Sequence, residues 1–349
     1  MQIDFHHAVT YVAARFAGFG HDEAAVVAHA AQHVDDATSD RRVVFDNRAM
    51  YTRIASAHKN FDPHNLDELE SHLVWLPFHF LPGNGGAKAG TDPTGTFIDK
   101  IRCLPGHRSP VAQDMIEATI QVRHKPNALH RLGITMHVYA DTWSHQGFAG
   151  VLHRVNAVNH MEDIGSSRAF GPTWLGDIMG DLVPPLGHGQ ARIFPDMPFL
   201  RWAYENGRGE AIERNNPADF REAADAMCRA MQRFRAAPET GIPASDLERI
   251  GALFTRRDTT TVKADKRHRI WLAAIGAGEF SFGAGVLTYA EEGPASWRAQ
   301  ALGTSEERAD YPYAPAFLAS HWKRFHDALQ EHRLTLLHDI LPKYGICAG

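Results

Sequence analysis

Cysteine is scarce in this sequence. The 349-residue chain contains three cysteines, Cys103, Cys228 and Cys347, and no two of them form a CxxC pair. This spacing argues against both a disulfide framework and a thiolate metal site. Any metal ion must therefore be bound by nitrogen and oxygen ligands.

Long apolar runs and an excess of positive charge are also missing. No stretch approaches the roughly 20 uncharged apolar residues of a membrane span. The first residues, MQIDFHHAV, lack the features of a signal peptide. We therefore expect no membrane span and a cytoplasmic location. A net charge of -5 argues against binding of duplex nucleic acid, so the expected partner is a small-molecule or short phosphoester substrate. No pattern indicates the oligomeric state.

Apolar residues recur every three to four positions over most of the chain, which is typical of amphipathic helices. The predicted helices are 5–17, 21–36, 109–122, 127–147, 217–236, 244–254, 264–275 and 315–343. Because alternating strand patterns are scarce, we predict an all-α fold, a multi-helix bundle with long irregular connections. A change in composition near 206–216 predicts that residues 1–205 form a helical core carrying a metal site. Residues 206–349 either complete the same domain or form a helical appendage.

Histidine, in contrast, is abundant: 17 of the 22 histidines lie at or before position 188. His137, Asp141 and His145 are spaced four residues apart, and at about 100° per residue they stay within about 80° of one helix face. Ile134 and Phe148 share this face, so the three polar side chains are expected to be buried. A carboxylate buried between two imidazoles is costly unless a cation compensates it. The spacing thus predicts metal ligation; a hydrogen-bonded His-Asp-His ladder is the alternative.

Two earlier helices supply further candidate ligands. Asp35 lies in the middle of the apolar face of its helix, where an ionised acid needs a cation or several donors, and it is the candidate catalytic and bridging carboxylate. His6 borders the apolar face of the first helix and is a candidate ligand, whereas His7 is expected at the surface. By helical phase, three more polar residues are expected to face solvent: His29, His33 and Asp36.

Loops supply the remaining candidates. His79 lies in a short apolar run that ends in a turn, and metal ligation and core packing suit it equally. His188 stands between two glycines and Asp196 follows in a Pro-Asp-Met-Pro turn; each is either a ligand or an ordinary loop residue. Five aromatic residues either line a pocket or belong to the core: Trp75, Phe80, Trp143, Trp174 and Trp202.

The N-terminal half resembles an uncharacterised bacterial domain family through the motifs FHxxxT, VDD, FHFLPGN and HxYADTWSHQGF. More distantly, the order of these residues resembles the zinc-dependent phospholipase C and single-strand-specific nuclease superfamily, all-helical enzymes that hold three zinc ions. That resemblance implies a metal-ligand set of His6, Asp35, His79, His137, Asp141, His145, His188 and Asp196. The superfamily also uses the amine of an N-terminal Trp, where this chain has an ordinary Met1. The resemblance therefore implies either two or three zinc ions.

The ligand set and the resemblance together predict a metal-dependent, zinc-preferring hydrolase. It would act on a phosphoester, as a phosphodiesterase or a phospholipase C-like enzyme, with metal-activated water. Fe or Mn would accept the same ligand atoms. Two alternatives stay open: a helical di-iron oxygenase-type enzyme, and a non-catalytic scaffold protein stabilised by metal.

Overall fold

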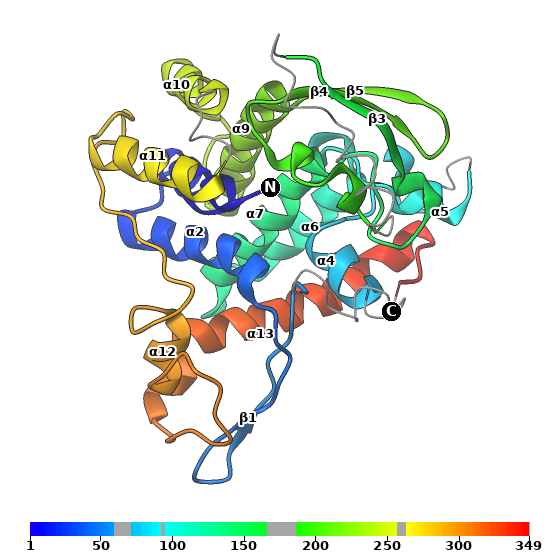
Figure 1. Ribbon diagram of the computed structural model, residues 1–349. Coiled ribbons are helices and arrows are strands. Elements are labelled where there is room, and N and C mark those ends of the chain that lie inside the picture. Colours follow the sequence, from blue (N-terminus) through cyan, green and yellow to red (C-terminus); the bar gives the residue numbers. More distant parts are fainter. Residues whose placement is uncertain (59–70, 92–94, 166–185, 257–262, 349) are drawn as a thin grey trace.

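A buried central helix organises the fold. The computed structural model describes residues 1–58, 71–91, 95–165, 186–256 and 263–348 (Figure 1). At its centre lies α7 (Ala128–Ser144), in which nearly every residue is buried. Three long helices pack against it: α2 (His21–Asp36), α9 (Asn216–Phe234) and α13 (His321–Leu334). An almost entirely buried helix can position polar side chains away from bulk water.

Shorter helices surround this centre. The other α-helices are α1 (Thr10–Phe16), α4 (Leu76–Phe78), α5 (Phe97–Ile101), α6 (Pro110–Gln121), α10 (Ala244–Thr255), α11 (Ala264–Gly276) and α12 (Trp297–Leu302). The 3-10 and π turns are η1 (Asp4–Val9), η3 (Ser71–Trp75), η4 (Asn84–Gly86), η5 (Gly106–Arg108), η6 (Arg154–Asn156), η7 (Gly189–Ala191), η8 (Phe194–Asp196), η9 (Pro315–Ala319), η10 (Thr335–Ile340) and η11 (Leu341–Tyr344).

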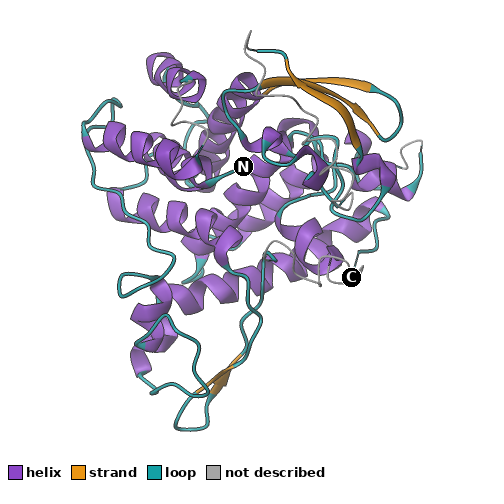
Figure 2. Ribbon diagram, viewed as in Figure 1, coloured by secondary structure: helices purple, strands orange, loops and turns teal. Residues whose placement is uncertain are grey.

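The prediction of an all-α fold is wrong, because the chain also forms two small antiparallel sheets (Figure 2). One is a ribbon of β1 (Val43–Val44) and β2 (Met50–Tyr51) that projects from the body. The other has the order β3 (Val158–Asp163), β4 (Arg201–Asn206), β5 (Ala211–Asn215). The fold is therefore mixed α/β. The strands have two to six residues, and β4 pairs with β3 some forty residues earlier, so no local sequence pattern revealed the sheet.

The two regions separated near residues 206–216 share a hydrophobic core. The β4–β5 hairpin and the start of α9 occupy these residues. Phe5, near the N-terminus, packs its ring 5.3 Å from that of Phe220 and 5.8 Å from that of Phe254. The C-terminal helices therefore pack directly against the N-terminal segment.

Gly133 sets the distance between α2 and α7. A Cβ at this position would lie 2.4 Å from the Val27 carbonyl oxygen and 2.6 Å from Ala30 Cβ. Gly133→Ala is therefore expected to lower the free energy of unfolding by about 1–3 kcal/mol, the usual cost of overpacking, as measured by urea denaturation. At Gly276, the last residue of α11, an added Cβ meets nothing within 4 Å. Gly276→Ala should thus be neutral or stabilising; equal losses in both variants would contradict this role of Gly133.

The histidines that helical phase placed in solvent are buried instead. His7, His29 and His33 are 0%, 8% and 8% exposed. Trp297 stacks on His29 with ring centroids 3.8 Å apart, and Phe325 packs 4.7 Å from His33. Asp36 is half-buried and accepts a hydrogen bond from the Tyr289 hydroxyl. The prediction failed because residues from the C-terminal third cover the outer face of α2, and the phase of one helix cannot show a second layer.

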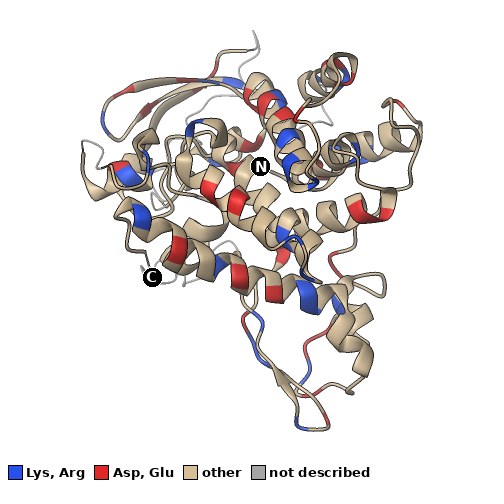
Figure 3. Ribbon diagram, turned by 180° about the vertical axis from the view of Figure 1, so that it is seen from behind, with Lys and Arg blue, Asp and Glu red and all other residues tan. Residues whose placement is uncertain are grey.

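Charge is distributed without a dominant sign on the face seen from behind, where acidic and basic residues are interspersed along the helices (Figure 3). Among the described residues, no helix combines the length and the apolar character needed to cross a membrane.

Candidate metal centre

Three groups of potential ligand atoms lie close together around α7. In each group the ligand atoms lie within 4.8 Å of one another. The groups are His6, Asp35 and His137; His79, His137 and Asp141; and His145, His188 and Asp196. The structure thus brings together all eight residues proposed as ligands, from η1, α2, the end of α4, α7 and two loop segments.

Four of the imidazoles are oriented in the same way. Each donates one ring N–H to a backbone carbonyl, which can only accept. The pairs are His79 Nε2 to Ser56 O at 2.9 Å, and, each at 2.8 Å, His137 Nδ1 to Ala31 O, His145 Nδ1 to His79 O and His188 Nδ1 to Arg192 O. The second nitrogen of each neutral ring therefore carries a lone pair. Such hydrogen bonds are typical of metal-ligating histidines.

The lone pairs converge most clearly around Asp141. His79 Nδ1 and His137 Nε2 lie 3.2 Å apart, and Asp141 Oδ2 lies 3.3 Å from each. If both rings are neutral, their N–H protons are donated to Ser56 O and Ala31 O, and these three atoms share no hydrogen. Tetrahedral zinc with Zn–N bonds of about 2.0–2.1 Å separates its ligand atoms by roughly 3.3–3.4 Å. The triangle therefore has the size of a metal-binding face.

His6 approaches the same carboxylate from η1. Its Nε2 lies 3.2 Å from Asp141 Oδ1, and its ring stacks on His137 with centroids 3.8 Å apart. Neither ring nitrogen has a hydrogen-bond partner among the described residues, although both are buried. Burial lowers the pKa of His6 to about 4, so the imidazole is neutral at pH 7 and can act as a ligand.

The third group lies beyond the end of α7. Asp196 Oδ1 is 3.6 Å from His145 Nε2, and Asp196 Oδ2 is 3.6 Å from His188 Nε2. The hydroxyl of Ser144 donates to Asp196 Oδ1 at 2.7 Å. Arg192, whose carbonyl accepts the His188 N–H, has φ 54° and ψ -127°, a conformation that a non-glycine residue adopts at a cost. This strained backbone fixes the orientation of His188.

The amine of Met1 lies between the groups of ligand atoms. The sequence did not predict Met1 as a residue of the site. Its nitrogen is 2.6 Å from Asp141 Oδ1 and 3.1 Å from Asp196 Oδ1. Burial lowers the pKa of this amine, but Asp141, Asp196 and Asp35 outweigh it and raise the pKa to about 11. Only the family resemblance pointed to this amine, because the resembled superfamily uses an N-terminal amine as a metal ligand. An ammonium group and a metal ion would compete for these carboxylate oxygens.

Negative charge exceeds positive charge at the site. Three carboxylates, Asp35, Asp141 and Asp196, face one ammonium group, which leaves two uncompensated negative charges if all three are ionised and the imidazoles carry none. Burial, and then repulsion by Asp141 and Asp36, raises the pKa of Asp35 well above its usual value. The Asp141 pKa, which burial alone would raise, is held well below its usual value by Met1 and by His145, His137 and His6. A divalent cation would offset the surplus.

One side of the site is accessible. The side chains of Asp35 and His188 are 31% and 21% exposed, whereas that of Asp141 is 1% exposed. Trp75 lies beside His79 and Phe80 stacks on His145, with ring centroids 5.2 and 4.5 Å apart. The other aromatic candidates do not line this side: Trp143 and Trp202 are fully buried in the core, and Trp174 lies outside the described residues. Solvent thus reaches the ligands beside Asp35 and His188.

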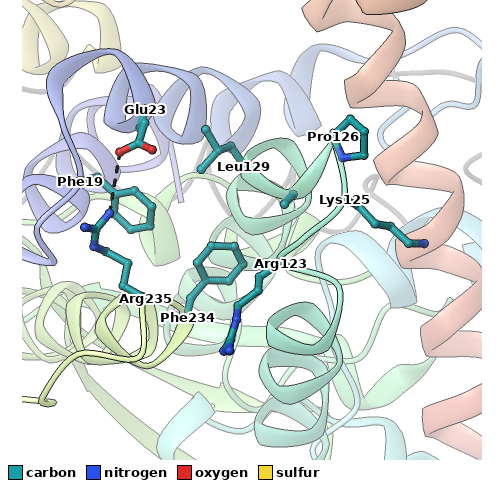
Figure 4. Close-up of a pocket in the computed structure, with 9 residues that line it drawn as sticks. Phe19, Glu23, Arg123, Lys125, Pro126, Leu129, Phe234 and Arg235 are labelled. Carbon is teal, nitrogen blue, oxygen red and sulfur yellow. Dashed lines mark ion pairs between the residues drawn. The ribbon is translucent and has the colours of Figure 1, made fainter.

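A separate cavity of about 360 Å³ lies near the start of α7 (Figure 4). Its lining includes Phe19, Arg123 and Leu129, and Glu23 pairs with Arg235 at 3.8 Å across it. Leu129 precedes His137 by eight residues, or about 12 Å along the helix axis. The cavity is therefore not part of the metal centre.

The chain belongs to DUF6765, a family of unknown function, whose model matches residues 1–340. This confirms the predicted membership of an uncharacterised domain family. No curated protein and no solved structure gives a significant match. The more distant resemblance to the zinc-dependent phospholipase C and nuclease superfamily stays a prediction.

Proposed function

We propose that this protein is a metal-dependent hydrolase that cleaves phosphoesters with two or three divalent ions, preferably zinc. The observation that carries the proposal is the triangle of His79 Nδ1, His137 Nε2 and Asp141 Oδ2, which lie 3.2 to 3.3 Å apart while each ring donates its other N–H to a backbone carbonyl. Nitrogen and oxygen ligands without thiolate suit zinc, and also Mn or Fe. The buried ring nitrogens of His6 and His145 that have no partner among the described residues fit the same interpretation.

The neighbouring groups support chemistry at more than one ion. His79, His137 and Asp141 would hold one ion, and His145, His188 and Asp196 another, with the Met1 amine between them. Bound divalent ions polarise phosphoryl oxygens, lower the pKa of a bound water and stabilise the leaving oxygen, which is why adjacent metal sites suit phosphoester hydrolysis.

Asp35 is the residue best placed for proton transfer. Its Oδ1 lies 3.8 Å from His137 Nε2 and 3.9 Å from His79 Nδ1, and it is the most exposed carboxylate of the site. A partly exposed carboxylate with a raised pKa can accept the proton of an attacking water. Asp35 would therefore orient this water or bridge two ions.

Neighbouring carboxylates provide a matched test of this role. Asp35→Asn is expected to lower kcat for phosphoester hydrolysis on the order of 100-fold or more, the usual contribution of a general base. Asp36→Asn is the control, because Asp36 accepts hydrogen bonds from Tyr289 and Gln32 and acts on Asp35 only through its charge, so its activity should change far less than that of Asp35→Asn. The measurement is turnover on phosphomonoesters, phosphodiesters and short nucleotides, beside elemental analysis of each variant. Equal losses in both variants would remove Asp35 from the mechanism.

A metal-stabilised scaffold is the second candidate, and the burial of most ligands favours it. His6, His137 and Asp141 are at most 1% exposed, as in a closed structural site. Bound zinc without turnover on the whole substrate panel would select the scaffold. Bound iron with near-ultraviolet absorption would select an oxygenase instead, and a protein that takes up no metal would contradict all three functions.

A further inference from the structure

The segment η1 carries two of the groups that reach the metal centre, the amine of Met1 just before it and the imidazole of His6 within it. Its other side chains face different neighbours. Phe5 packs against α9 and α10, while Asp4 and His7 face α11. A chain terminus normally frays unless tertiary contacts hold it. Asp4 and His7 therefore supply polar contacts, beside the packing of Phe5, that can fix these two groups.

A buried ion pair joins η1 to α11 across 263 residues of sequence. Arg267 donates from Nε to Asp4 Oδ2 at 2.7 Å and from Nη2 to Asp4 Oδ1 at 3.1 Å, so the contact is bidentate. The same Nη2 donates to Gln2 Oε1 at 2.5 Å. The side chains of Arg267 and Asp4 are 4% and 1% exposed. Bidentate Arg–carboxylate pairs fix orientation as well as distance.

A second contact lies beside the first. His7 Nδ1 and His268 Nε2 are 2.9 Å apart, and both residues are buried. Because Arg267 and His268 are consecutive, one turn of α11 holds two residues of η1, one on each side of the Phe5–His6 pair. This leaves His6 directed at His137 and Asp141.

We propose that Asp4, His7, Arg267 and His268 form a clamp whose role is to position the His6 imidazole for metal binding and to hold the Met1 amine beside the same carboxylate. None of these four residues belongs to the ligand groups of the centre, so they are positioning residues. This inference rests on the proposed metal-binding function. It assigns a role to α11, which lies far from the ligands in sequence. A buried ion pair contributes little net stability relative to apolar residues, so a positioning role explains its presence better than stabilisation does.

The test removes both charges of the clamp at once. Arg267→Met alone leaves Asp4 buried and unpaired and risks unfolding, so the main variant is the double substitution Asp4→Asn/Arg267→Met. Arg269→Met is the matched control, because Arg269 lies on the same helix in an exposed ion pair with Asp265. Arg267→Lys keeps the charge but loses the bidentate geometry and should be intermediate.

Metal binding and hydrogen exchange, measured together, separate the clamp from the metal site. In zinc titrations against a competing chelator, the double variant should bind one ion on the order of 10–100-fold more weakly, the usual effect of a lost orienting partner. The unfolding midpoint of the double variant and its affinity for the other zinc ions should match those of Arg269→Met. In hydrogen exchange of the metal-free proteins, residues 4–9 should exchange faster in the double variant alone. With cobalt in place of zinc, the visible absorption spectrum should change in the double variant and stay as in wild type in Arg269→Met.

Each result decides one of the two ideas. Zinc affinity and exchange equal to wild type in the double variant would overturn the clamp. A wild-type protein that binds no zinc would overturn the metal centre, and hydrogen exchange of residues 4–9 would then still decide whether the clamp holds η1. Faster exchange with unchanged zinc binding would show that the clamp holds the segment without positioning ligands, which also overturns the proposal.

Discussion

Asp141→Asn is expected to lose nearly all bound metal. Asp141 is the carboxylate with the most contacts in the centre, to the Met1 amine at 2.6 Å, to His6 at 3.2 Å, and to His79 and His137 at 3.3 Å. Losing a partner that only orients a ligand already lowers metal affinity about 10–100-fold. Losing a carboxylate shared by several ligands should exceed 100-fold. Zinc content after gel filtration, with turnover measured beside it, gives the result.

The same change should destabilise the metal-free protein. Without the Asp141 charge, the buried Met1 ammonium loses its closest partner, and breaking a buried pair costs about 3–5 kcal/mol. Asp246→Asn is the control, since Asp246 is also buried and hydrogen-bonded, to Ser281 N and Oγ at 2.9 and 2.6 Å, but lies outside the ligand groups. It should lose stability and keep its zinc. An Asp141→Asn protein with full zinc content would contradict the metal centre as drawn.

Acidification is expected to unfold the metal-free protein between about pH 6.5 and pH 4. Burial lowers the pKa of several histidines far below the usual 6.5. The values are about 4 for His6, His33 and His188, about 3 for His130 and about 2 for His29. The unfolded chain therefore binds protons below pH 6.5 while the folded chain does not.

The sign of the effect follows from this difference. Stability is fully present above the unfolded pKa of about 6.5 and is lost as the pH falls towards the folded values. A histidine with a folded pKa near 4, such as His33, contributes a loss of roughly 2 kcal/mol by pH 5. Asp36, whose pKa burial raises to about 6, and Asp35, whose pKa burial raises well above its usual value, act in the opposite direction, but five histidines outweigh them. Their sum is comparable to the whole stability of an ordinary domain, about 5–15 kcal/mol.

The measurement is the urea unfolding free energy at pH 7.5 and at pH 5, with chelator present. His130→Gln, a buried position outside the ligand groups, should reduce the pH dependence by about one proton. Added zinc should raise stability at pH 7.5 and lose this effect at pH 5 as the ligands protonate. A free energy independent of pH over this range would show that the imidazoles bind protons equally in the folded and the unfolded chain, which contradicts the lowered pKa values.

The parts of the site that local periodicity defines were the ones open to prediction. His137, Asp141 and His145 lie on one side of α7 because a helix repeats every 3.6 residues, and Asp35 points inward on α2 for the same reason. His79 and His188 lie in irregular segments, where residue type alone suggested them. The ion pair of Asp4 with Arg267 depends on pairing across the chain and leaves no local signal. The same limit explains why His29 and His33 were placed wrongly in solvent and why the three-stranded sheet was missed.

The long separation between Asp4 and Arg267 also determines when the N-terminal segment can become fixed during synthesis. Translation proceeds at about 5–20 residues per second. The separation of 263 positions between the two partners therefore corresponds to roughly 13–50 s of elongation, a delay during which α11 does not yet exist. Every ligand from His6 to Asp196 leaves the ribosome before the helix that secures Met1 and His6. Met1 and His6 are consequently fixed only late in the synthesis of the chain.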